Sequence, residues 1–215
     1  MVFDDRPVYF YGMENKNNEQ EREIEVSEPA VKYGNITPTE FWEMTNDGEN
    51  RFEYYDGYVI KLDAVCWQHD TIEHNLSRKL ELFLDGKGCK VMGPNMPVGN
   101  ATAKSYMLPD RIVLCEKMLL STKFKCLLNP AVIFEVLSPS NREIDMEIKR
   151  QYYQEFLTLQ EYVMVDSQKR EIIVVRKQFN NKWGPDEIIT GNNNLLIKTI
   201  GYHLPLQEIY RDTGL

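Results

Sequence analysis

Two acidic residues interrupt stretches of the sequence that otherwise look like buried β-strands. Asp110 follows a proline and opens an apolar run at residues 110–115, and Glu135 stands inside the apolar run 131–137. An ionised carboxylate in a buried strand costs free energy unless it is paired or bound to a metal ion. Two such carboxylates about 4 Å apart would repel each other by roughly 4 kcal/mol at an effective dielectric constant near ~20. A divalent cation would remove this repulsion, and hard oxygen ligands favour Mg²⁺ or Mn²⁺ over softer metals.

A third group of polar residues follows the second acid. Asp145, Lys149 and Tyr153 recur four residues apart, which places them on one face of a predicted helix. An acid at the start of one strand, an acid inside the next strand and a lysine on the following helix match the order of groups in a metal-dependent nuclease. The sequence therefore predicts a phosphodiester-cleaving site built from Asp110, Glu135 and Lys149.

Each of these residues also has an ordinary structural interpretation. Asp110 could cap a turn after its proline, and Glu135 could pair with a buried arginine or lysine. Lys149 could be a solvated helix lysine, as most helix lysines are. The combination of all three is harder to explain by structure alone.

The elements that must position these groups are predicted from capping, turn and periodicity signals. The capping box Thr37-Pro38-Thr39-Glu40 predicts a helix over 38–45, and Asp56-Gly57 predicts a hairpin at 51–62. Apolar residues at helical spacing predict two longer helices at 69–85 and 141–158. Short β-type runs predict six further strands, and the result is one α/β domain with strands at 89–93, 110–115, 131–137, 161–166, 170–178 and 185–190.

Composition bounds the class of protein. The chain has 215 residues, of which 42% are hydrophobic and 27% charged, as expected for a globular domain. Residues 1–35 are predicted to form an acidic, flexible extension and residues 36–215 the folded domain. We expect a cytoplasmic protein without membrane contact, since no apolar run reaches the roughly 18 residues of a membrane span and the N-terminus does not resemble a signal peptide. The net charge of −8 indicates modest, salt-sensitive affinity for bare DNA.

The four cysteines, Cys66, Cys89, Cys115 and Cys126, form no C-x-x-C pair. Zinc sites usually bring two ligands close in sequence, so a cysteine-based zinc site is not expected. Free thiols that act as small core residues are the simplest interpretation.

Several short motifs together resemble a known family. They are FEYYDG at 52–57, HDTI at 69–72, PD at 109–110, FEVLSPS at 134–140, the helix with Asp145, Lys149 and Tyr153, and EYVMVD at 161–166. This series is similar to the Uma-type (Uma-two) family, a branch of the PD-(D/E)XK nuclease superfamily. The resemblance covers roughly residues 36–210. EVLSPS with the downstream lysine and tyrosine is its specific part, whereas the PD dipeptide alone is weak.

The resemblance implies a restriction-endonuclease-like core, a mixed β-sheet flanked by helices. It also implies that Asp110 and Glu135 ligate Mg²⁺ or Mn²⁺, with help from the backbone carbonyl of Val136. The usual lysine position, two residues after the second acid, is Leu137 here, and Lys149 fits the role of a lysine that has moved to the next helix.

Other residues receive supporting roles by the same resemblance. Glu53 fits an additional acid near the metal, and Ser138 and Tyr153 are candidates for hydrogen bonds that hold the ligands. His69 could reach a phosphate. Arg111 departs from the family pattern, so its strand could lie at a sheet edge or its side chain could reach solvent or phosphate.

The implied partner is nucleic acid, with DNA preferred, and a homodimer would supply the two sites that double-strand cutting needs. Two alternatives remain open. One is an inactive nuclease-fold protein that binds nucleic acid or a protein, and the other is a structural oligomer-forming module whose acids pair with arginines.

Overall fold

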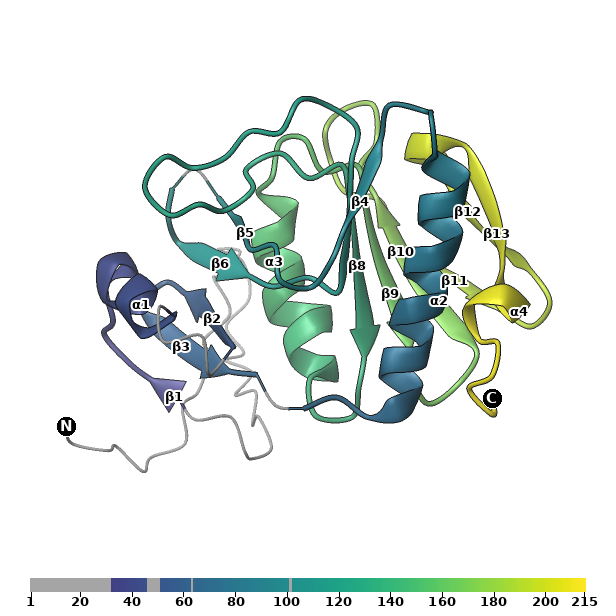
Figure 1. Cartoon of the computed structure of the whole chain (residues 1–215), viewed down its shortest axis with the longest axis horizontal. Helices are drawn as coiled ribbons and strands as arrows, with labels where there is room; N and C mark the ends of the chain where they lie inside the picture. The colour runs from purple at the N-terminus through teal and green to yellow at the C-terminus, as the bar shows by residue number, and fades with distance from the viewer. Residues whose placement is uncertain (1–31, 46–50, 63, 101) are drawn as a thin grey trace.

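A mixed six-stranded sheet forms the centre of the protein (Figure 1). The computed structural model describes residues 32–45, 51–62, 64–100 and 102–215, so the predicted extension lies outside the described residues up to residue 31. Strand β8 pairs with β9 in parallel and every other pair is antiparallel. In spatial order the strands are β11 (Glu187–Thr190), β10 (Glu171–Arg176), β9 (Glu161–Asp166), β8 (Val132–Leu137), β7 (Arg111–Leu114) and β4 (Lys90–Met92).

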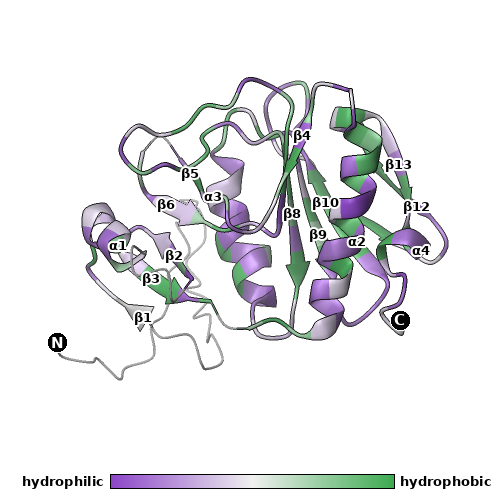
Figure 2. Cartoon of the chain, viewed as in Figure 1, coloured by the Kyte–Doolittle hydropathy of each residue, from purple (hydrophilic) through white to green (hydrophobic). Residues whose placement is uncertain are grey.

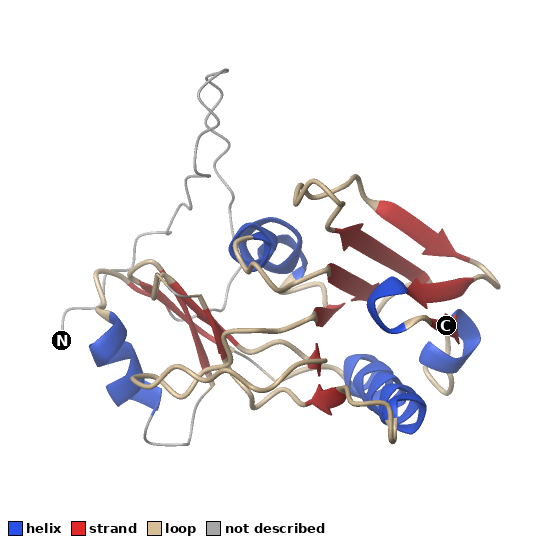
Figure 3. Ribbon diagram, turned by 90° about the horizontal axis from the view of Figure 1, so that it is seen from above, coloured by secondary structure: helices blue, strands red, loops and turns tan. Residues whose placement is uncertain are grey.

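Helices cover both faces of this sheet, as the view from above shows (Figure 3). Helix α2 (Trp67–Leu84) buries the stripe Ile72, Leu76 and Leu80 against one face. A π-helical turn, η1 (Ile144–Lys149), continues into α3 (Arg150–Gln154) and covers the other face. Figure 2 shows the apolar character of the strands between the two layers.

Strand β8 shows how the sheet divides its side chains between the two layers. Val132, Phe134 and Val136 belong to the core on the α2 side, and Ile133 and Leu137 belong to the core on the η1 side. Successive side chains of a strand point to opposite faces, so residue 135 faces η1 and α3.

A second sheet packs beside the first and carries the predicted hairpin. It contains β1 (Lys32–Tyr33), β3 (Tyr58–Lys61), β2 (Phe52–Tyr55), β6 (Ser105–Met107) and β5 (Val98–Gly99), in that order. Asp56 and Gly57 both have positive φ angles, 44° and 101°, as a tight two-residue hairpin turn requires.

Helix α1 (Pro38–Thr45) begins at the predicted capping box. The backbone amide and Oγ1 of Thr37 donate to Glu40 Oε2 at 2.8 and 2.7 Å, and the Glu40 amide donates back to Thr37 Oγ1 at 3.3 Å. Phe41 is buried among Tyr54 and Tyr106 of the second sheet. The capping signal in the sequence therefore fixes where this helix begins.

The C-terminal part of the chain forms a hairpin and a short helix against α2. Strands β12 (Asn194–Ile197) and β13 (Tyr202–Pro205) flank the 3₁₀ turn η2 (Lys198–Ile200), and α4 (Leu206–Ile209) follows. Asn75 of α2 donates to the Ile209 carbonyl at 3.0 Å. The β12–β13 hairpin was not predicted from the sequence.

Two predictions need correction. The helix predicted over 141–158 ends at Gln154, because its last residues leave the helix to bury Phe156 and Leu159 in the core. The prediction that all cysteines are free is wrong for two of them, since Cys89 and Cys115 form a disulfide next to the paired residues Lys90 and Leu114. Antiparallel pairing brings these cysteines, 26 residues apart in sequence, to a Cα separation of 4.0 Å.

No helix in the described part of the chain is both long enough and apolar enough to cross a bilayer.

Candidate active site

One lysine lies among three carboxylates in the interior. Lys149 Nζ is 3.0 Å from Asp145 Oδ1 and 3.1 Å from both Glu53 Oε1 and Glu135 Oε1. All four side chains are at most 5% exposed. Three elements meet here: the hairpin strand β2 supplies Glu53, the central strand β8 supplies Glu135, and η1 supplies the other two.

Tyrosine hydroxyls and a backbone amide hold two of these acids in place. Tyr153 OH donates to Glu135 Oε1 at 2.6 Å, and Tyr55 OH donates to Glu53 Oε2 at 2.6 Å. The Leu108 amide donates to Glu53 Oε1 at 2.8 Å. These bonds fix the orientation of Glu53 and Glu135, so that one oxygen of each carboxylate stays next to the Lys149 amine.

Asp110 stands just before β7, across from Glu135. The β7–β8 register pairs Arg111 with Phe134, and continuing it by one position puts Asp110 opposite Glu135. Residues directly opposite each other on antiparallel strands have Cβ atoms roughly 4.5–5.5 Å apart. The Val136 amide donates to Asp110 Oδ2 at 2.6 Å, which fixes this aspartate against β8.

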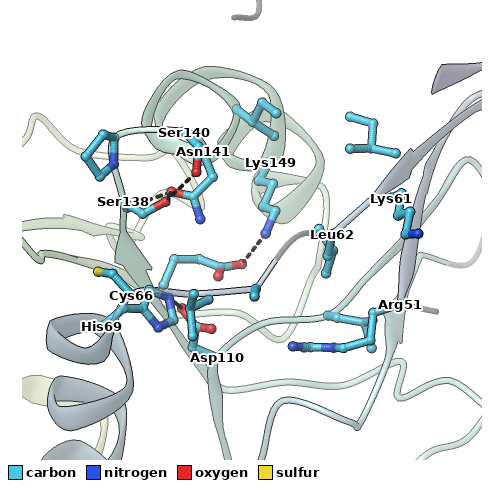
Figure 4. A pocket seen from close by; sticks show the side chains of 17 residues that line it. Arg51, Lys61, Leu62, Cys66, His69, Asp110, Ser138, Ser140, Asn141 and Lys149 are labelled. Carbon is cyan, nitrogen blue, oxygen red and sulfur yellow. Dashed lines mark hydrogen bonds and ion pairs between the residues drawn. The ribbon is translucent and has the colours of Figure 1, made fainter. Parts of the chain in front are cut away.

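Both acids open into the same cavity, of about 270 Å³ (Figure 4). Lys149 lies on its wall beside the 138–141 turn, and Arg51 extends into it from the opposite side. Among the residues that the structure describes, Asp110 and Glu135 are the two that line the cavity with a carboxylate. A substrate that enters would thus meet both acids and the lysine together.

Burial shifts the protonation of the cluster. Burial raises the pKa of Glu135 well above its usual value and raises the pKa of Asp145 to about 7. The charge of Lys149 lowers both pKa values, and the neighbouring carboxylates raise them further. Burial alone would lower the pKa of Lys149, but Asp145, Glu135 and Glu53 raise it well above its usual value. The lysine is therefore a fixed cation, and the acids compete for protons or other cations.

Asp110 behaves differently from Glu135. Burial would raise its pKa, but the hydrogen bond and charge of His69 and the bond from the Val136 amide hold the pKa below its usual value. His69 Nε2 lies 3.3 Å from Asp110 Oδ2. Burial lowers the pKa of His69, and the contact with Asp110 outweighs it, so the pKa is raised. Asp110 is consequently ionised over the physiological range.

Asp110 and Glu135 each use one carboxylate oxygen for their contacts with other described residues. In the described residues, the side-chain contacts of Asp110 use Oδ2, and those of Glu135 use Oε1. Each carboxylate keeps its second oxygen for another ligand. Hard carboxylate oxygens fit Mg²⁺ or Mn²⁺, so these residues suit the implied metal.

The structure brings some of the predicted residues together and not others. Glu53, Glu135, Lys149 and Tyr153 are in direct contact, and Asp110 shares their cavity. Ser138 bonds instead to Asn141 and Ser140, within its own turn.

Two further expectations concern Val136 and Arg111. Val136 donates its amide to Asp110, and the role that the resemblance implies for its carbonyl stays a prediction. Arg111 lies in a strand with neighbours on both sides and pairs with Glu73, so the edge-strand explanation is wrong.

Three contacts were not anticipated from the sequence. Tyr55 supports Glu53, Asp145 contacts Lys149, and Glu73 lies near both His69 and Asp110. The spacing of Asp145 and Lys149 could have indicated their contact. Nothing comparable marks Glu73, whose neighbour Asp110 is far away in sequence.

Comparisons with known proteins agree with this architecture. A family model described as "Uma2: Putative restriction endonuclease" matches residues 38–207. Two relatives come from Synechocystis sp.: uncharacterized protein slr1290 is 27% identical over 187 residues, covering 85% of this chain and 95% of the relative. Uncharacterized protein sll1609 is 25% identical over 158 residues, covering 73% and 89% respectively.

A solved structure shares the fold. The crystal structure of a "putative nuclease belonging to DUF820" from Anabaena variabilis superposes with a TM-score of 0.67 at 15% identity. The match covers 81% of this chain and 97% of that one. It confirms the predicted restriction-endonuclease-like fold, a mixed sheet flanked by helices.

Proposed function

Because this chain belongs to the Uma2 family, described as "putative restriction endonuclease", we propose that it hydrolyses phosphodiester bonds in DNA. The reaction would use Mg²⁺ or Mn²⁺ held by Asp110 and Glu135, with Lys149 as the catalytic cation. The alternative is an inactive protein that binds nucleic acid or a protein through the same cavity.

The observation that carries this proposal is the charge of the buried cluster. Three carboxylates surround one ammonium, which gives a formal charge of −2 when all are ionised. Asp110, across from Glu135, adds a further negative charge that His69 only partly offsets. Buried ions are costly unless they are paired, so the cluster needs either protons or a cation. A divalent cation between Asp110 and Glu135 meets this need at neutral pH.

Lys149, Tyr153 and Glu53 would each have a separate role beside the metal ion. A divalent ion supplies Lewis acidity toward a phosphoryl oxygen and a nucleophilic water. Lys149 offsets the negative charge that develops on the phosphate, and its three carboxylate contacts hold the amine in one position. Tyr153 holds Glu135 through Oε1, which would leave Oε2 for a bound cation. Glu53 contacts the amine of Lys149 and acts through it, as a positioning residue.

DNA remains the preferred substrate because the family description names a restriction endonuclease. The chain is acidic overall, so we expect weak binding that falls steeply with salt. A homodimer would place two such sites on opposite strands, and sedimentation in the presence of DNA would detect it.

Plasmid nicking tests the proposal. Wild-type protein should convert supercoiled plasmid to nicked or linear forms with Mg²⁺ or Mn²⁺, and not with EDTA. Asp110→Ala, Glu135→Gln and Lys149→Met should each lose roughly 10²-fold or more of the rate. Asp70→Asn, an exposed acid on α2, is the control and should cut normally. Plasmid that stays intact with wild-type protein and either metal would refute the nuclease and favour the binding protein.

A further inference from the structure

A second set of metal-ligating side chains adjoins the proposed site on its α2 side. His69, Glu73 and Asp110 each offer one ligand atom, and these atoms all lie within 4.8 Å of one another. His69 is 1% exposed and Asp110 9% exposed, so the group lies in the interior. It is the only such group of three or more found among residues 32–45, 51–62, 64–100 and 102–215.

Helix α2 sets the spacing of two of these residues. His69 and Glu73 are four residues apart, so they lie on one face of the helix, one turn from each other. That face meets the start of β7, where Asp110 stands. The 3.3 Å contact between His69 Nε2 and Asp110 Oδ2 shows that the helix and the strand approach closely enough for one ion to touch both.

Arg111 stabilises the third ligand. Its NH1 donates to Glu73 Oε1 and, at 2.7 Å, to the backbone carbonyl of Asp110. The described residues make no other side-chain bond to Glu73, which leaves Oε2 for an ion. An arginine that holds one oxygen of a ligating carboxylate is an ordinary way to orient it. Arg111 also offsets part of the negative charge of Glu73, so a cation at His69, Glu73 and Asp110 would bind more weakly than one at Asp110 and Glu135.

We propose that His69, Glu73 and Asp110 form a second position for a divalent cation, and that this position takes Mn²⁺ in preference to Mg²⁺. The inference rests on the proposed function, because Asp110 is shared with the position at Glu135. Imidazole nitrogen suits transition metals, whereas Mg²⁺ prefers oxygen ligands and keeps its waters. Paired metal positions that share a carboxylate are a known arrangement for phosphodiester hydrolysis.

Electron paramagnetic resonance of bound Mn²⁺ tests this directly, without an activity readout. Titration of the full chain should show two Mn²⁺ per chain, and pulsed spectra should show coupling to an imidazole nitrogen. His69→Gln should remove the nitrogen coupling and one of the two ions. Glu73→Gln should weaken the same ion roughly tenfold or more and keep the coupling of what remains.

Other variants locate each ion. Glu135→Gln should remove the first ion and leave the nitrogen-coupled one, while Asp110→Asn should weaken both. His74→Gln is the matched control, an exposed histidine on the same helix, and should change neither the count nor the coupling. Circular dichroism of each variant identifies any that fail to fold, and the two independent ligand variants then still decide the question.

The outcomes separate this inference from the proposed function. One Mn²⁺ without nitrogen coupling, lost in Glu135→Gln and retained in His69→Gln, would overturn the second position and leave the nuclease site intact. Nitrogen coupling that persists in His69→Gln would also overturn it. No Mn²⁺ binding by the wild-type protein would contradict both proposals.

Discussion

Asp145 Oδ1 lies 3.0 Å from Lys149 Nζ, and no other described group pairs with either carboxylate oxygen of this fully buried aspartate. The two residues are four apart on a π-helical turn, a variant of helix that often occurs at functional sites. Asp145 therefore depends on Lys149 for its compensation. The charge of Lys149, in contrast, is balanced by three carboxylates, those of Glu53, Glu135 and Asp145. Loss of the lysine should therefore affect all three acids.

Removing the lysine should destabilise the metal-free protein. Lys149→Met leaves Glu53, Glu135 and Asp145 without their cation, and breaking a buried ion pair in this way costs about 3–5 kcal/mol. Urea unfolding in EDTA measures this loss. The control is Lys169→Ala, whose exposed pair with Glu171 should contribute less than about 1 kcal/mol. Equal, small losses for both variants would mean that the cluster is not held by Lys149.

Stability of the metal-free protein should fall as pH rises through the range from about 5 to 7. Burial raises the folded-state pKa of Asp145 from 3.8 to about 7, so the folded protein keeps a proton that the unfolded chain has lost. For a group of this kind the free energy of unfolding declines by at most about 1.4 kcal/mol per pH unit between its unfolded and folded pKa values. Asp145→Asn should flatten the decline, and Mg²⁺ should reduce it. An unchanged slope in the variant would refute this assignment.

The proton on His69 should report on Asp110. In EDTA the contact with Asp110 raises the pKa of His69 above 6.5, so its contribution to stability is complete below that pH and is lost as pH rises through the raised value. A cation at Asp110 should lower this pKa. NMR titration of the three histidines with and without Mg²⁺ measures the effect, with His203 as the reference that should not respond. A His69 curve that is insensitive to Mg²⁺ would argue against a metal at Asp110.

The disulfide between Cys89 and Cys115 should contribute about 3–4 kcal/mol, the value for a loop of its 26-residue separation in the chain-entropy estimate. Urea unfolding of the oxidised protein and of a Cys89→Ala/Cys115→Ala variant gives the difference. Cys66→Ala, which removes an exposed free thiol, is the control and should have little effect. Alkylation of four thiols in unreduced, unfolded protein would contradict the disulfide.

Local signals predicted most of the secondary structure. The capping box located the start of α1, and Asp56-Gly57 located the β2–β3 turn, because caps and tight turns are decided by a few adjacent residues. The strand predicted at 161–166 matches β9 residue for residue. Hairpin β12–β13 was missed because its strands are short and only partly buried, so their alternation is weak.

Contacts between distant segments were harder to predict. The disulfide depends on the β4–β7 register, which spacing alone does not give. Glu73 looks like an ordinary polar residue of an amphipathic helix, and only the packing of α2 against β7 brings it to Asp110. Glu135 could be identified because a charge inside an apolar strand is costly and so points to a special environment.

Mg²⁺ titration by calorimetry is the most direct test of the proposed metal site. Wild-type protein should bind Mg²⁺ at neutral pH, and Asp110→Ala and Glu135→Gln should each abolish the heat of binding while remaining folded. Binding should also release protons, seen as a dependence of the heat on the buffer, because the ion replaces protons held by the buried acids. Identical titrations for the wild type and both variants would contradict a cation held between Asp110 and Glu135.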